Sequence, residues 1–128
     1  MQQKVQQELF KQFNGLFRPD VKFDKDNREV IMDGVTFSPD GSVQEVVEIV
    51  SLELPDFSKI PMYVTQVRNE MERQGLERAR LRLVVVAEEI TGLSAKELLN
   101  KYGKSANLTF YKLNSEDMTI SLVEPLES

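Results

Sequence analysis

The sequence predicts an α/β fold, a mixed β-sheet with helices packed on its faces. The first observation is a long hairpin over residues 28–54, rich in β-branched side chains on both sides of a turn. The second is the apolar run at residues 83–86, which is typical of a central strand covered on both faces. The third is the set of helical-period stretches between the strands. The expected order is helix-strand-strand-helix-strand-helix-strand-strand, in a single domain over residues 1–128.

Residues 1–17 predict an amphipathic first helix. Its apolar positions recur at helical spacing, at Val5, Leu9, Phe13 and Leu16. Gly15 weakens the end of this helix and Pro19 stops it. Residues 21–23 are compatible with a short strand, and residues 24–27 predict a turn.

The hairpin that follows holds the acidic candidates of the sequence. In its first strand, Asp33 shares one face with Ile31, Val35 and Phe37 by the two-residue period. Residues 38–41 form a turn with proline and glycine in their favoured positions. The second strand, residues 43–54, carries Glu45 and Glu48 and is ended by Pro55.

Two registers of this hairpin are open, and they pair Asp33 with different glutamates. A three-residue loop with a glycine bulge pairs Ser38 with Ser42 and places Asp33 on the face of Glu45. A four-residue loop instead places Asp33 and Glu48 diagonally on one face. A slip of one residue turns every side chain to the other face, so the sequence leaves both pairings open.

The second helix is expected to start at Ser58 as N-cap, with Pro61 in its first turn and Gly75 after its end. Its apolar stripe is formed by Ile60, Val64, Val67 and Met71. A strand is expected at residues 78–88. A capping box at residues 94–97 predicts a short helix that ends near Gly103. Two final strands are expected at residues 107–113 and 118–123.

Composition excludes several classes of chemistry. The chain has no cysteine and no histidine, which excludes a thiol nucleophile, a typical zinc site and a Ser-His-Asp triad. Metal chemistry would therefore need carboxylates and a hard ion such as magnesium. A net charge of −5 disfavours broad binding to nucleic acid, although a local basic patch stays open. Without a membrane-length apolar run or a signal-peptide pattern, we expect a cytoplasmic protein with no membrane partner.

The predicted order, with Asp33 in one hairpin strand and Glu48 in the next, resembles the PD-(D/E)xK or restriction-endonuclease-like superfamily. The resemblance covers residues 1–89 and implies a core of a helix, a three-strand meander, a helix and a further strand. It implies magnesium held between Asp33 and Glu48, or Glu45 in the other register. It also implies that Glu8 is the extra acidic residue of some members.

The same resemblance implies a catalytic lysine two residues after Glu48, where this chain has Val50. Lys59 or Arg68 of the next helix would be displaced substitutes. We therefore expect a non-catalytic nuclease-like domain without a cofactor, which binds a protein or nucleic-acid assembly or associates with itself. The alternatives are an active magnesium-dependent nuclease that uses Asp33 and Glu48, and a structural subunit of a larger complex.

Three arginines at alternate positions, Arg78, Arg80 and Arg82, are a further candidate for binding. On one strand face they would present a guanidinium about every 7 Å. Such a ladder would contact an anion or a partner, or would be a solvated face paired with acidic side chains. For Asp33, the alternative to a metal or phosphate role is a bulge with the carboxylate bonded to backbone.

Overall fold

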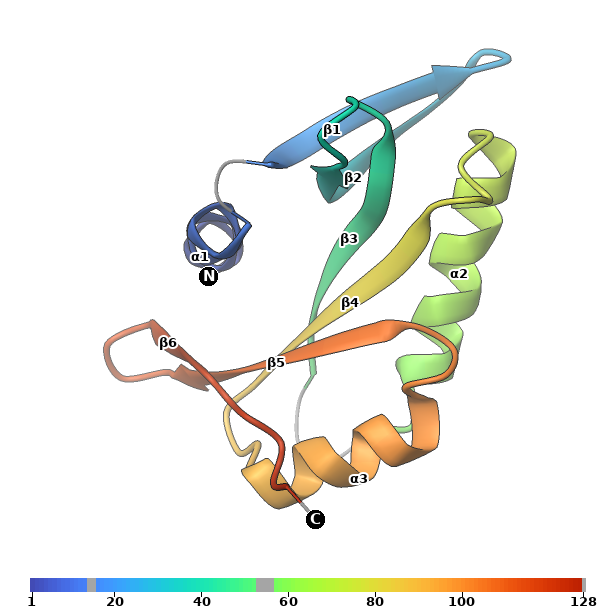
Figure 1. Ribbon diagram of the computed structural model, residues 1–128. Helices are drawn as coiled ribbons and strands as arrows, with labels where there is room; N and C mark the ends of the chain where they lie inside the picture. Colours follow the sequence, from blue (N-terminus) through green and yellow to red (C-terminus); the bar gives the residue numbers. More distant parts are fainter. Residues whose placement is uncertain (14–15, 53–56, 128) are drawn as a thin grey trace.

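The fold is known from a computed structural model, which describes residues 1–13, 16–52 and 57–127 (Figure 1). In chain order the elements are α1 (Gln2–Gln12), β1 (Phe17–Lys25), β2 (Arg28–Phe37), β3 (Val43–Ser51), α2 (Ile60–Arg73), β4 (Arg80–Ala87), α3 (Gly92–Tyr102), β5 (Asn107–Asn114) and β6 (Thr119–Leu122). The predicted mixed α/β class is confirmed.

One six-stranded sheet carries the strands in sequence order, β1-β2-β3-β4-β5-β6. The strands β1, β2 and β3 form an antiparallel meander, β3, β4 and β5 are parallel, and β6 returns antiparallel to β5. Both parallel steps need a crossover, and α2 and α3 provide them. The edges of the sheet are β1 and β6.

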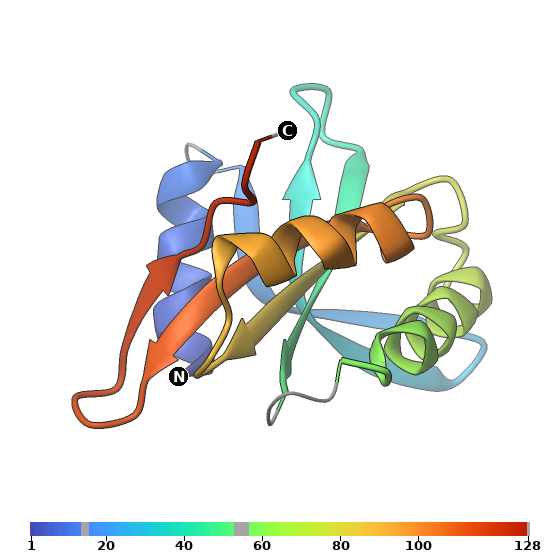
Figure 2. The same ribbon diagram turned by 90° about the horizontal axis from the view of Figure 1, so that it is seen from below.

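Helices cover both faces of the sheet. Figures 1 and 2 show α1 on one side of the sheet, with α2 and α3 on the other. The α1 side buries a cluster that includes Val5, Leu9 and Phe17, and the other side buries a larger cluster that includes Ile60 and Leu98. Residues of β4 alternate between the two clusters, so the run at residues 83–86 is a central strand buried on both faces, as predicted.

The strand β1 is the main correction to the predicted element order. It has nine residues and pairs with β2 along its length, where the sequence indicated at most a short strand. The sequence pattern does not indicate this strand, because most of its side chains are exposed at a sheet edge and many of them are polar. The turn that joins it to β2 is the predicted one, with Asp26 and Asn27 both at positive φ, which suits a tight hairpin.

The first helix is shorter than predicted. It ends at Gln12, and Phe17 begins β1, where its ring is fully buried beneath α1. An aromatic residue in phase with a helical stripe fits a buried strand position equally well, which explains the error. The expectation for Gly15 falls outside the described residues.

The caps of the later helices also differ from the predictions. The N-cap of α2 is Lys59 rather than Ser58, although Pro61 is in the first turn as expected. In α3, Thr91 is the N-cap and Ser94 is the third helical residue, so the capping box is Thr91–Ser94. The two side chains exchange backbone hydrogen bonds, a role that serine at this position fills as glutamate would.

The end of β3 and the start of β4 can also be compared with the predicted bounds. The strand β3 is described to Ser51, and the predicted extension over residues 53–56 falls outside the described residues. The strand β4 begins at Arg80, so Arg78 lies in the preceding turn.

Among residues 1–13, 16–52 and 57–127, no helix is long and apolar enough to cross a membrane.

Candidate functional site

The turn between β2 and β3 has the geometry of the three-residue loop. The Ser38 N–H donates to the Ser42 carbonyl at 2.9 Å, and Gly41 has a φ of +88°. The Asp40 carboxylate accepts hydrogen bonds from the backbone and hydroxyl of Ser42, which lower the pKa of Asp40. Taken alone, this loop would set Asp33 beside Glu45.

A bulge next to the turn reverses that outcome. The register shifts by one residue near Phe37, because Gln44 has no cross-strand partner in β2. Beyond the bulge, the strands pair at the shifted register as far as Gly34. Asp33 and Glu48 are the next residues along the two strands. The structure thus combines the turn of the first predicted register with the carboxylate pairing of the second.

Each of these two carboxylates bonds to backbone of the opposite strand. Oδ2 of Asp33 accepts the Ile49 N–H at 2.8 Å, and Oε1 of Glu48 accepts the Asp33 N–H at 3.4 Å. The ladder between β2 and β3 has ended at this point, so the side chains serve N–H groups that strand pairing no longer serves. The carboxylate pair, Asp33 and Glu48, therefore closes the fork where the two strands separate.

The environment of the pair favours one proton between the two groups. Burial, followed by the negative charge of Asp33 and the hydrogen bond between the two side chains, raises the pKa of Glu48 from 4.5 to about 8. At neutral pH Glu48 is therefore mainly protonated. Two carboxyl groups this close do not ionise together without cost, and they titrate as a coupled pair.

Side-chain amides of α1 cover the fork. Gln2 donates to Oδ1 of Asp33 at 3.1 Å, and Gln6 donates to the Asp33 carbonyl at 3.0 Å. The Gln6 amide also reaches Oδ1 of Asp20 in β1 at 3.0 Å. Asp20 has a φ of +52°, an unusual backbone for a residue other than glycine. Gln6 is 7% exposed, so its amide ties α1 to β1 and β2 from a buried position.

The glutamines and Asp20 were missed by the sequence reasoning. Gln2 and Gln6 are four residues apart, on one side of a helix, and that spacing was the available signal. Their position over a carboxylate became visible only with the packing of α1. Asp20 follows Pro19 and is typical of a turn, yet it lies within a strand.

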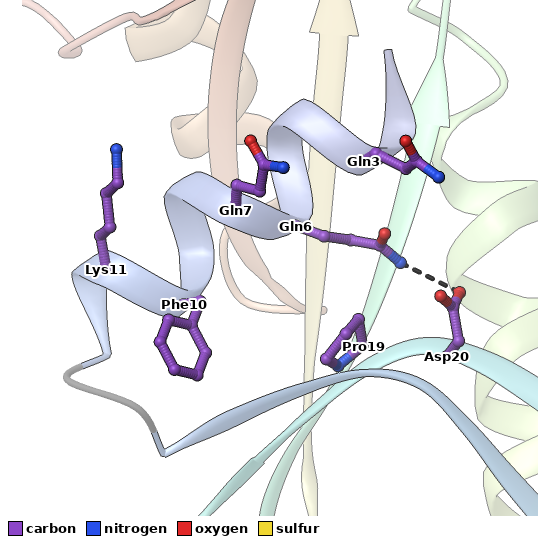
Figure 3. A pocket seen from close by; sticks show the side chains of 7 residues that line it. All are labelled: Gln3, Gln6, Gln7, Phe10, Lys11, Pro19 and Asp20. Atoms are coloured by element: carbon purple, nitrogen blue, oxygen red, sulfur yellow. Dashed lines mark hydrogen bonds between the residues drawn. The ribbon is translucent and has the colours of Figure 1, made fainter.

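A groove runs between α1 and β1 beside the fork. Figure 3 shows its lining, with the Gln6 amide pointing at Asp20. The volume of this α1–β1 groove is about 580 Å³, and its lining consists of Gln3, Gln6, Gln7, Phe10, Lys11, Pro19 and Asp20. Phe10 is 49% exposed there, an unusual fraction for a large aromatic side chain.

Glu45 has a structural position away from the carboxylate pair. Its side chain is buried and forms a two-point salt bridge with Arg82, with distances of 2.9 and 3.1 Å. Asn107 donates to the same carboxylate at 2.7 Å, and Arg82 also donates to the Thr109 hydroxyl at 2.7 Å. The guanidinium lies 5.5 Å from the centre of the Phe13 ring. The Glu45 carboxylate is thus bound to Arg82 and Asn107, and of the two pairings left open by the sequence the structure has Asp33 with Glu48.

The predicted arginine ladder does not form. Arg78 precedes β4, and the Arg82 guanidinium is bound to Glu45, as the alternative of pairing with acidic side chains foresaw. Arg80 is exposed at the start of β4 and lines two small pockets. Among the contacts that the structure describes, Arg82 is engaged within the protein, whereas the side chains of Arg78 and Arg80 are both available to an external anion.

The other residues implied by the resemblance lie apart from the pair. Glu8 is on a different side of α1 from Gln2 and Gln6, near Tyr111, whose pKa is raised by burial and then by the charge of Glu8. Arg68 binds the Ser105 carbonyl at the α3–β5 turn. Val50 is packed in the cluster under α2 and α3. Lys59 is the N-cap of α2.

A magnesium ion at this position would be held by the two carboxyl groups of the pair. Carboxylate ligands bind a hard cation in their ionised form with free oxygens. Here one member of the pair is protonated at neutral pH, and each accepts a backbone hydrogen bond. Within the described ranges, no group of three or more acidic, histidine or cysteine side chains could hold a metal ion. A cation bound at this pair would therefore have to displace the proton that the two carboxyl groups share.

Comparisons with known proteins complete the description of the site. A scan of protein-family models gave no match, and searches of curated proteins and of solved structures gave no significant match.

Proposed function

We propose that this chain is a non-catalytic domain with a restriction-endonuclease-like sheet, and that it acts by binding a protein partner. The observation that carries the proposal is the reciprocal bonding of the carboxylate pair. Asp33 and Glu48 each accept a backbone N–H of the opposite strand, and burial keeps Glu48 protonated at neutral pH. The pair then closes the sheet where an active relative would bind metal.

Two further features support this proposal. Val50, at the lysine position of the resembled superfamily, is an apolar side chain with 9% exposure in the larger core cluster. An antiparallel meander of β1, β2 and β3 leads through α2 to parallel β4, in the order that the superfamily would require. The sheet supports the resemblance, and the residue at position 50 supports the loss of catalysis.

A cleavage assay tests the catalytic half of the proposal. Plasmid and single-stranded DNA are incubated with the protein and Mg²⁺ or Mn²⁺, and Asp33→Asn is run beside the wild type. We expect no nicking from either protein. Metal-dependent cleavage by the wild type that disappears in Asp33→Asn would overturn the proposal. It would favour the second candidate, an active nuclease, for which the meeting of Asp33 and Glu48 is the supporting observation.

The α1–β1 groove supports a protein as the partner. The side-chain amides of Gln3 and Gln7 form no hydrogen bond with another described residue, and each offers both donors and an acceptor. Phe10 and Pro19 add apolar surface between them. Side-chain amides match the backbone of an extended peptide, and the apolar surface matches its side chains. The net charge of −5 disfavours the phosphate backbone of nucleic acid.

A matched pair of variants tests this groove. Phe10→Ser changes the groove, while Met62→Ser removes an apolar side chain of nearly equal exposure, 47%, from α2. Proteins crosslinked to the chain in its host cells are compared among wild type, Phe10→Ser and Met62→Ser. We expect the partner band to be lost only in Phe10→Ser. A band that persists in Phe10→Ser, or that both variants lose, would place the contact elsewhere.

Self-association is the remaining candidate, and the edge strand β6 favours it. In the described part of the chain β6 pairs with β5 alone, so its outer N–H and C=O groups are available to a second copy, and Leu122 is 47% exposed. Light scattering at increasing protein concentration tests this candidate. A constant monomer mass would exclude it.

A further inference from the structure

A pocket at the start of β4, beside α2 and the α3–β5 turn, gathers positive charge from three elements. Arg68 comes from α2, Arg80 from β4 and Lys104 from the α3–β5 turn. We call it the cationic pocket; its volume is about 240 Å³, and the rest of its lining is Ala79, Leu81, Gly103, Ser105, Ala106 and Asn107. Figures 1 and 2 show the α3–β5 turn beside α2. In a chain of net charge −5, three cations around one small cavity are unexpected.

These cations are not neutralised within the protein. The side chains of Arg80 and Lys104 form no ion pair or hydrogen bond with another residue in the described part of the chain. Arg68 uses its guanidinium on the Ser105 carbonyl, which leaves most of its five donors for another acceptor. The lining of the adjoining pocket includes one acidic side chain, Glu45, which is already bound by Arg82. The charge is thus available to an external anion.

The adjoining pocket indicates that the anion belongs to a larger molecule. This second cavity, of about 390 Å³, shares Arg80 and Asn107 with the cationic pocket and adds Phe13, Gln44 and Leu99. Gln44 is the exposed bulge residue of β3. Asn107 gives its amide N–H to Glu45, and its oxygen can still accept. Aromatic, apolar and amide groups therefore lie next to the cations.

We propose that the two pockets together bind a small phosphate monoester. The phosphate group contacts Arg68, Arg80 and Lys104, and the organic part lies against Phe13, Gln44 and Leu99. Arginine forms two-point hydrogen bonds with phosphate oxygens, which suits the phosphate to this position. The monoester can come from a nucleotide or from a sugar phosphate, and the experiment separates the two.

Arg80 is the decisive residue for the test. Lys104 follows the C-terminus of α3, where a cation also stabilises the helix dipole, so its replacement would change two things at once. Arg68 also donates a hydrogen bond to the Ser105 carbonyl and so stabilises the α3–β5 turn. Arg80 has no second role among the described contacts. Arg28→Gln is the matched control, since it makes the same charge change at a residue that lines neither pocket.

The experiment is an amide NMR titration of the full chain with inorganic phosphate, ribose 5-phosphate and AMP, at constant ionic strength set by chloride. We expect saturable shifts at residues 103–107 and at the start of β4 with the monoesters, and weaker ones with phosphate alone. Tighter binding of AMP than of ribose 5-phosphate would assign the organic pocket to a base. Equal affinities would assign it to the sugar.

The affinity should fall at least tenfold in Arg80→Gln and stay unchanged in Arg28→Gln, with thermal unfolding confirming that both variants are folded. Three results would overturn the proposal. They are no saturation up to about 10 mM monoester, equal losses in the two variants, and binding of a short phosphodiester oligonucleotide in place of the monoesters.

Discussion

Asp33 and Glu48 bond across the fork between β2 and β3, each to the backbone of the other strand. The Asp33 carboxylate accepts the Ile49 N–H at 2.8 Å, and the Glu48 carboxyl accepts the Asp33 N–H at 3.4 Å. A pair of acidic side chains among valines would suggest chemistry, but here both groups replace strand pairing. Burial, and then the negative charge of Asp33, raise the pKa of Glu48 and keep it protonated at neutral pH.

The stability of the protein should therefore depend on Glu48 and pH. Its pKa in the folded protein, about 8, is above the ordinary 4.5. The stabilising contribution is complete below about pH 4.5 and is lost as the pH rises through 8. Glu48→Gln mimics the protonated form, so it should be more stable than the wild type by about 1–2 kcal/mol at pH 9 and similar to it at pH 5. Urea unfolding at both values measures this, with exposed Glu97→Gln as control. A difference that is independent of pH would contradict the shared proton.

The contribution of Asp33 can be separated into acceptor and charge. Asp33→Ala leaves the Ile49 N–H without its acceptor and should cost about 1–3 kcal/mol, whereas Asp33→Asn keeps an oxygen and should cost less. Because the charge of Asp33 helps raise the pKa of Glu48, that pKa should fall in Asp33→Asn. Carboxyl ¹³C NMR measures the pKa of Glu48. Asp20→Asn is the control and should leave this pKa unchanged. If both variants shifted the pKa of Glu48 equally, the effect would not be specific to the pair.

The bridge between Glu45 and Arg82 should matter far more than an exposed one. Glu45→Ala leaves a half-buried guanidinium and the Asn107 amide without their acceptor, and should cost about 3–5 kcal/mol. Glu29→Ala removes the 3.1 Å pair with Lys22, in which both side chains are more than half exposed, and should cost less than about 1 kcal/mol. Urea unfolding compares the two, and similar losses would show that the Glu45 network carries no special weight.

Gly34 is required by the packing of Phe17. A Cβ at Gly34 would lie 2.2 Å from Cε2 of the Phe17 ring, which is fully buried. Gly34→Ala should lower the free energy of unfolding by about 1–3 kcal/mol through overpacking. Adding Phe17→Leu to the same chain should recover part of this loss. Gly41→Ala is the control. It meets nothing within 4 Å and should cost about 1–2 kcal/mol, because its φ is +88°. Phe17→Leu should not rescue that variant in thermal unfolding, and a rescue there would argue against a local clash.

Much of the fold was predictable because local signals agreed with burial. The β-branched hairpin, the apolar run of β4 and the stripe Ile60, Val64 and Met71 all reflect faces that the structure buries. The strand β1 was harder to predict, since most of its side chains are exposed and, within the described sheet, it pairs with β2 at an edge. The choice of N-cap in α2 and α3 was off by a few residues, because several neighbouring polar residues suit that role locally.

The candidate site was predictable in its residues but not in its geometry. A carboxylate at Asp33 and two nearby glutamates were recognisable, and so were the absence of histidine and cysteine and the valine at position 50. Which glutamate meets Asp33 depended on the bulge at Gln44, for which the sequence has no signature. One inserted residue turns the whole strand over, so only the tertiary pairing of β2 with β3 decided that Glu48 joins Asp33 at the fork and Glu45 joins Arg82.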